Sequence, residues 1–122
     1  MVEDNIASDR RGERSNSEEL LLMAAENLKR SIELTVRQLQ AKKVRGEMKL
    51  RWSRSLTRQV QALVVVAEAL NKIGSKSAVD LDLASYLSAV ESRVPKTYAS
   101  RRLALMVIKT KMIWGRHTHG RI

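Results

Sequence analysis

Apolar residues recur every three or four positions along most of this chain, and little interrupts that period. The first series is Leu21, Ala25, Leu28, Ile32, Val36 and Leu39, and the second is Trp52, Leu56, Val60, Leu63, Ala67 and Leu70. Such spacing places side chains on one face of an α-helix. The chain has one proline and five glycines, so few residues can end a helix. We therefore expect an all-α fold built from a few long helices.

Capping residues, glycine and proline indicate where the first two helices begin and end. Ser15 and Glu18 form a capping box, so we expect the first helix to begin there and to run to about Val44. Gly46 is then the turn between the two helices. Gly74 ends the second helix, because glycine readily adopts the left-handed conformation that closes a helix.

Two shorter helices are expected after Gly74. The third begins at Ser77, which forms a second capping box with Asp80, and ends at Pro95. The fourth begins at Thr97, runs to about Trp114 and is ended by Gly115. Residues 103–108 are apolar all round, which predicts burial on several sides.

The pattern divides the chain into three parts. Residues 1–14 have no apolar period and are interpreted as a flexible charged arm. Residues 15–58 form an arm of long helices, a helix-turn-helix in the loose sense with its turn near residue 46. Residues 59–122 form a C-terminal helical bundle with a basic tail. We expect surface ion pairs Glu26–Arg30 and Glu33–Arg37 on the first helix, and we expect four methionines to fill gaps in the core: Met23, Met48, Met106 and Met112.

The net charge of +10 is concentrated in two segments. Residues 37–58 carry eight bases and one acid, Glu47, and residues 97–122 carry six bases and no acid. Residues 1–36 are net negative, and residues 59–96 are balanced. A protein that needs charge only for solubility usually has acidic and basic residues interspersed. The concentration of bases in two segments therefore favours a polyanionic partner.

The second helix is predicted to present two opposite faces. Arg51, Arg54 and Arg58 share one face, and the Trp52, Leu56 and Val60 stripe lies nearly opposite. The apolar stripe can pack on protein while the guanidiniums bind phosphate through two hydrogen bonds at once. A solvated charged turn and a membrane-surface helix are the alternatives, the latter because Leu50 and Trp52 suit an interface. The same stripe is needed to bury the second helix, which disfavours membrane contact.

Other chemistry finds little support in the sequence. Cysteine is absent, and His117 and His119 bracket a single threonine, too few ligands for a metal site. There is no glycine-rich phosphate loop and no evident carboxylate partner for either histidine. We expect no enzyme activity, no cofactor, no metal and no small-molecule substrate. The first 17 residues lack the apolar segment of a secretory signal, so we expect the protein to be made in the cytoplasm.

The stretch "VAEALNKIG", Val66 to Gly74, resembles a helix ending in the major coat proteins of rod-shaped and filamentous archaeal double-stranded DNA viruses. The layout around it is also similar to theirs, with a polar N-terminal arm, long helices with a basic turn and a helical C-terminal half. The resemblance implies paired subunits whose helical arms clasp double-stranded DNA in the A form. Two features depart from that family, namely a low aromatic content and a strongly basic final segment.

The sequence and the resemblance together predict a structural nucleocapsid protein. It would dimerise, with itself or with a paralogous coat subunit, and polymerise on double-stranded DNA without reading its sequence. It would be located in the virion, and in the host cytoplasm before assembly. The alternative is a small helical nucleic-acid-binding subunit of a cellular complex, such as a CRISPR small subunit or a chromatin factor.

The predicted nucleic-acid contacts fall into two groups. The first comprises Arg37, Lys42, Lys43, Arg45, Lys49, Arg51, Arg54 and Arg58, with Arg10, Arg11 and Arg14 of the arm. The second is a possible further basic surface made of Arg101, Arg102, Lys109, Lys111 and Arg116.

Overall fold

A computed structural model describes the backbone of residues 2–76 and 82–119 and the side chains of residues 16–76 and 82–113. Its helices are α1 (Val2–Gln40), α2 (Gly46–Lys72), α4 (Leu83–Arg93) and α5 (Arg101–His119), and a 3-10 helix, η1 (Lys96–Tyr98), precedes α5. No strand occurs within these described ranges. The predicted all-α fold class is therefore confirmed.

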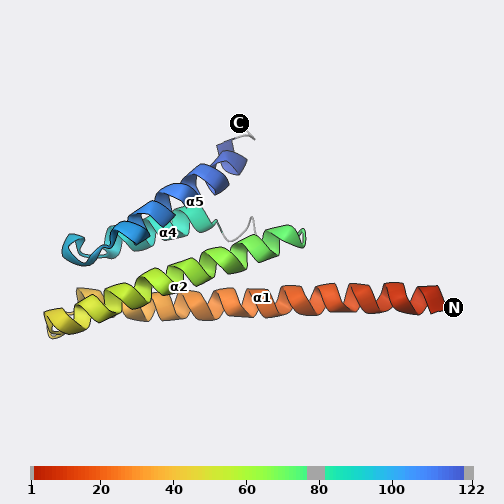
Figure 1. Cartoon of the computed structure of the whole chain (residues 1–122), viewed down its shortest axis with the longest axis horizontal. Coiled ribbons are helices and arrows are strands. Elements are labelled where there is room, and N and C mark those ends of the chain that lie inside the picture. Colours follow the sequence, from red (N-terminus) through yellow and green to blue (C-terminus); the bar gives the residue numbers. More distant parts are fainter. Residues whose placement is uncertain (1, 77–81, 120–122) are drawn as a thin grey trace.

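Helices α1 and α2 form a long antiparallel hairpin, and α4 and α5 pack together beyond α2 (Figure 1). At 1.5 Å per residue, α1 with its 39 residues is about 58 Å long, and α2 with its 27 residues is about 40 Å long. The N-terminal part of α1 consequently extends past the end of α2 (Figure 1). The hydroxyl of Ser75 donates a hydrogen bond of 2.7 Å to Glu18 Oε1 and so marks where α2 ends beside α1.

One hydrophobic cluster joins helices α1, α2, α4 and α5. It contains Ala25, Ile32, Val36 and Leu39 of α1, Leu56, Val60, Leu63 and Ala67 of α2, Leu83, Leu87 and Val90 of α4, Val94, and Leu103 and Val107 of α5. The members from α1 and α2 are those of the two predicted stripes, and they are almost fully buried. The periodic spacing of the sequence thus identified the core faces of the hairpin correctly.

The first helix begins and ends elsewhere than expected. It begins at Val2 instead of Ser15, and it ends at Gln40 instead of Val44. Residues 2–14 contain no proline, and a single glycine, Gly12, costs only about 1 kcal/mol inside a helix. The helical conformation therefore continues through the segment that was interpreted as a flexible arm. The division of the chain at residues 14 and 58 stays a prediction.

Gly74 closes α2 in the predicted manner. Its φ is +74°, in the left-handed region. The backbone N–H of Ser75 donates to the carbonyl of Leu70 at 3.0 Å, and that of Gly74 donates to Asn71 at 3.1 Å. This pair of bonds is the Schellman motif. The predicted capping box of Ser77 and Asp80 lies outside the described residues.

The last helix is capped by a different residue than expected. The N–H of Leu103 donates to Ser100 Oγ at 3.0 Å, so Ser100, and not Thr97, is the N-cap of α5. Thr97 lies in η1 instead. At its other end, α5 continues through Gly115 to His119, because glycine weakens a helix without stopping it. Pro95 follows the end of α4, as predicted.

The apolar centre of α5 is buried on one side only, which contradicts the prediction of burial on several sides. Leu103 and Val107 are buried, whereas Leu105 is 64% exposed and Ile108 is 54% exposed. The reason is that α4 and α2 cover only one face of α5. The prediction for the methionines was also wrong for three of four. Met23, Met48 and Met112 are exposed, and only Met106 packs against the core.

No helix in the described part of the chain has both the length and the apolar character needed to cross a membrane.

Candidate nucleic-acid interface

Four helix ends meet at the end of the molecule that carries the turn between α1 and α2 (Figure 1). The side chain of Gln40, at the end of α1, donates a 2.9 Å hydrogen bond to the carbonyl of Arg93, at the end of α4. The hydroxyls of Thr57 in α2 and Ser100 before α5 lie 2.9 Å apart. Ser53 Oγ donates to the carbonyl of Tyr98 in η1. These bonds hold segments that are far apart in the sequence side by side. We call this region the turn end; it comprises the end of α1, the start of α2, the end of α4, η1 and the start of α5.

The first predicted basic group gathers at the turn end and along the adjacent part of α2. Its exposed members are Arg37, Lys42, Lys43, Arg45, Arg51, Arg54 and Arg58. Lys49 is half-buried, and its ammonium lies 5.6 Å from the centre of the Tyr98 ring, a cation–π contact that links α2 to η1. Lys49 is therefore held against protein, while the other members face solvent.

The N-terminal half of α2, which begins at the turn end, has the two opposite faces that its sequence predicted. Arg51, Arg54 and Arg58 are exposed. Leu56 and Val60 are buried in the core on the other side. Hydrogen bonds of the Ser53 and Thr57 hydroxyls to the η1–α5 segment fix the helix between these faces. The geometry leaves the three guanidiniums free to bind a ligand without disturbing the core.

The start of α5 adds bases to the same region. Arg101 and Arg102 are exposed and directly follow Ser100. Because the Ser100 hydroxyl is hydrogen-bonded to that of Thr57, the start of α5 lies beside the part of α2 that carries Arg54 and Arg58. Two basic segments, separated by 43 positions from Arg58 to Arg101, are thereby brought together. Lys96 of η1 is also exposed here, although it was not among the predicted contacts.

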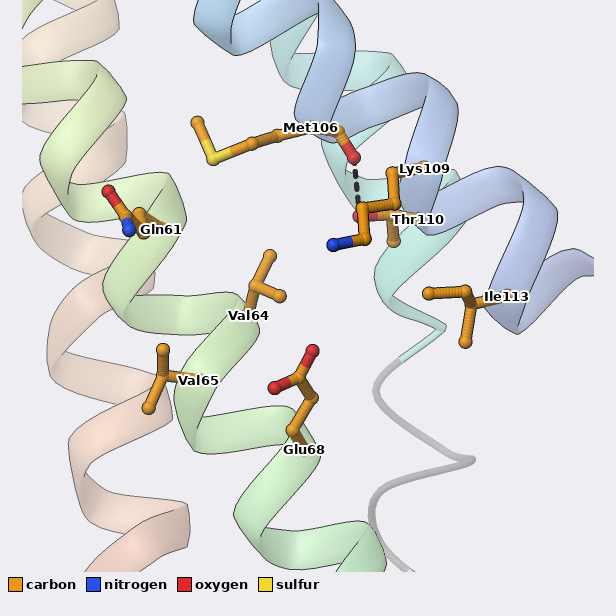
Figure 2. A pocket seen from close by; sticks show the side chains of 8 residues that line it. All are labelled: Gln61, Val64, Val65, Glu68, Met106, Lys109, Thr110 and Ile113. Carbon is orange, nitrogen blue, oxygen red and sulfur yellow. Dashed lines mark hydrogen bonds between the residues drawn. The ribbon is translucent and has the colours of Figure 1, made fainter.

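The rest of the second basic group is not part of this surface. Lys109 lies eight residues, or about 12 Å, further along α5. It lines a cavity of about 210 Å³ between α2 and α5, opposite Glu68 (Figure 2). Val64, Val65, Met106 and Ile113 supply its apolar lining. Lys111 is exposed, and the side chain of Arg116 lies outside the described residues.

The arginines of the N-terminal segment are distant from the turn end. Arg14 precedes Gln40 by 26 residues on one continuous helix, which corresponds to about 39 Å. Arg10 and Arg11 lie further still along α1. Their side chains, and those of His117 and His119, are outside the described residues. Within the described part of the chain, no group of three or more metal-ligating side chains occurs.

One base near the turn end is committed to an ion pair. Both terminal nitrogens of Arg93 donate to the Glu33 carboxylate at 2.7 Å. This bidentate bond lowers the pKa of Glu33 and raises that of Arg93. The Tyr86 hydroxyl donates to Glu33 at 3.2 Å, and burial, with the nearby Glu33 charge, raises the pKa of Tyr86 to about 12.

The Glu33–Arg93 pair joins α1 to α4 across 60 positions, so no local sequence signal could have indicated it. It replaces the expected i, i+4 pair of Glu33 with Arg37, and Arg37 remains exposed. The expected pair of Glu26 and Arg30 is not formed either, as both side chains point to solvent. Arg37 is consequently available to a ligand, whereas Arg93 is not.

No known protein family, curated protein or solved structure matches this chain. The resemblance of residues 66–74 to archaeal virus coat proteins stays a prediction.

Proposed function

We propose that this protein is a structural nucleocapsid protein that binds double-stranded DNA at the turn end, without reading its sequence, and assembles along the duplex. The observation that carries the proposal is the convergence of two basic segments on one region of the surface. The hydrogen bond between Thr57 and Ser100 joins these segments. Location in a virion is part of the same proposal.

The mechanism is neutralisation of phosphates with release of counterions. Arg51, Arg54 and Arg58 extend along about 10 Å of α2, which is comparable to the roughly 12 Å width of the major groove. Guanidiniums spaced in this way can bind phosphates on both sides of a groove, each through two hydrogen bonds. Contacts of this kind fix the position of the protein and carry no direct sequence information.

The packing of the hairpin refines how a duplex would be held. Ile32, Val36 and Leu39 of α1 pack into the same buried cluster as Leu56 and Val60 of α2. No space for a duplex exists between two helices that share a core. We therefore propose that DNA lies against the turn end and the outer face of α2, and is not clasped between α1 and α2.

This one-sided surface also suits the alternative function, a small nucleic-acid-binding subunit of a cellular complex. Such a subunit would contact nucleic acid at one end and its partners elsewhere. Electron microscopy of the protein with long duplex DNA separates the two functions. A nucleocapsid protein produces regular filaments of uniform width, and a subunit of a larger complex binds without producing them.

Binding itself is tested by fluorescence anisotropy with two duplexes of equal length and unrelated sequence. We expect equal affinities for both and a several-fold loss for Arg101→Gln combined with Arg102→Gln. A control with Lys72→Gln and Lys76→Gln removes the same charge from the opposite end of α2, where both side chains are exposed. A marked preference for one duplex, or equal losses in the two variants, would refute the proposed site.

A further inference from the structure

The cavity between α2 and α5 is bordered by one face of each helix (Figure 2). Four residues from each helix line it, at positions i, i+3, i+4 and i+7, so each face extends over about 10 Å. Val64 and Met106 pack against the core and so form its inner part. Val65 and Ile113, which are 57% and 46% exposed, line it nearer to solvent. The cavity is therefore apolar inside and accessible from outside.

Two opposite charges face each other across this cavity. The Glu68 carboxylate comes from α2 and the Lys109 ammonium from α5, and Figure 2 shows both directed into the space between the helices. Within the described part of the chain, neither group forms an ion pair or a hydrogen bond. The Thr110 hydroxyl, which also lines the cavity, already donates to the carbonyl of Met106 at 2.6 Å. The two charges are therefore the groups that a ligand has to satisfy.

The size of the cavity limits what can occupy it. Its volume is about 210 Å³. An apolar cavity of about 150 Å³ holds benzene, and sites for drug-sized ligands begin at about 300 Å³. A ligand of roughly ten non-hydrogen atoms therefore fits.

The two charges limit the chemistry of that ligand. An apolar group in the cavity displaces water from the Glu68 carboxylate and the Lys109 ammonium, and a charge that loses water without gaining a partner is costly. A ligand with only a carboxylate would leave Glu68 without a partner, and a ligand with only an amine would leave Lys109 without one. A small molecule that carries both charges and an apolar group satisfies both residues.

We propose that this cavity binds an α-amino acid with an apolar side chain, with its carboxylate on Lys109 and its ammonium on Glu68. The apolar side chain then lies against Val64 and Met106. This site goes beyond the proposed DNA binding and does not depend on it, because Lys109 lies about 12 Å along α5 from Arg101 at the turn end. Binding is measured without DNA, so its failure would leave the DNA site untouched, and a failure of DNA binding would leave this site untouched.

Titration of the nitrogen-15-labelled full chain with four small molecules, followed by NMR, tests the proposal. The first is L-leucine, for which we expect a dissociation constant of about 1 mM and shifts concentrated in residues 61–68 and 106–113. The others are 4-methylpentanoate, which lacks the ammonium, L-leucinamide, which lacks the carboxylate, and glycine, which lacks the apolar side chain. Each should bind about ten-fold more weakly than leucine, because each loses one of the three contacts.

Two variants assign the charged contacts to their residues. Glu68→Gln should weaken leucine about ten-fold and leave 4-methylpentanoate unchanged, since that ligand has no ammonium to lose a partner. Lys109→Gln should weaken leucine about ten-fold and leave L-leucinamide unchanged. Glu19→Gln and Lys111→Gln are the matched controls, because both side chains are exposed and lie outside the cavity. Both controls should bind leucine like the wild-type chain.

Other outcomes would overturn the proposal. Absence of saturable shifts with leucine up to tens of millimolar would mean that the cavity is not a site for this class of ligand. Equal affinity for leucine and its three analogues would mean that the charges and the apolar lining do not recognise it together. A loss of 4-methylpentanoate binding in Glu68→Gln equal to the loss of leucine binding would mean that Glu68 acts through the fold and not on the ammonium. Weakened binding in either control would equally overturn the proposed contacts.

Discussion

Replacing Leu56 by alanine should destabilise the protein far more than the same replacement at Leu50, six residues earlier on α2. Leu56 is 1% exposed and belongs to the core, whereas Leu50 is 53% exposed. The change removes three carbon atoms from the side chain, worth about 0.8 kcal/mol each when buried, or about 2.4 kcal/mol. The cavity left behind raises the expected loss for Leu56→Ala to about 3 kcal/mol.

Leu50→Ala should lower the free energy of unfolding by less than about 1 kcal/mol, because much of the Leu50 side chain is already in water. Urea denaturation followed by far-ultraviolet circular dichroism, which reports the helical content, measures both free energies of unfolding. DNA affinity should fall for Leu56→Ala only in proportion to the unfolded fraction. Equal losses at the two positions, or a loss below about 1 kcal/mol at Leu56, would refute the assignment of the core face.

Three further predictions concern local features. Gly74→Ala should cost about 1–2 kcal/mol by the same urea measurement, because alanine is strained at a φ of +74°, and an unchanged midpoint would contradict the left-handed cap. Ser100→Ala removes the cap of α5 and the partner of Thr57, and should cost about 1 kcal/mol, with Thr97→Ala as the near-neutral control. Since the pKa of Tyr86 is raised from 10.0 to about 12, its contribution to stability is complete below pH 10 and is lost as the pH rises through 12. The wild-type chain should therefore lose stability faster than Tyr86→Phe in that window, and parallel curves would contradict the burial of the hydroxyl.

The sequence was a good guide to the elements whose signals are local. The three-and-four spacing identified the core faces of α1 and α2, and Gly74 identified the end of α2. Leu56 on one face and Arg54 on the other follow from helix geometry alone. These features depend on residues within two or three turns of each other, so a single segment contains the information.

Features that depend on packing between helices could not be predicted in this way. The sequence of α5 is apolar around its circumference near Leu105, and only its neighbours decide which side is buried. The start of α1 at Val2 was missed because a capping box at Ser15 is also compatible with the interior of a helix. The cap of α5 was predicted at Thr97, and the bond of the actual cap, Ser100, to Thr57 comes from the tertiary fold.

Most residues of the candidate interface were predicted from the sequence, but the way in which they are brought together was not. The exposed bases between Arg37 and Arg58 were all named from charge alone. That Arg101 and Arg102 join them, while Lys109 lines a cavity on another side, required the packing of α5 on α2.

The salt dependence of DNA affinity tests the central claim most directly. For the wild-type chain, the logarithm of the affinity should fall linearly with the logarithm of the salt concentration. Replacing Arg51, Arg54 and Arg58 by glutamine should reduce the slope by up to about three, about one for each phosphate that is no longer neutralised, with the fold intact. A control that replaces Arg30, Lys72 and Lys76 removes the same charge from exposed positions outside the turn end and should retain the wild-type slope. A flat salt response, or an equal reduction in both variants, would contradict DNA binding at this surface.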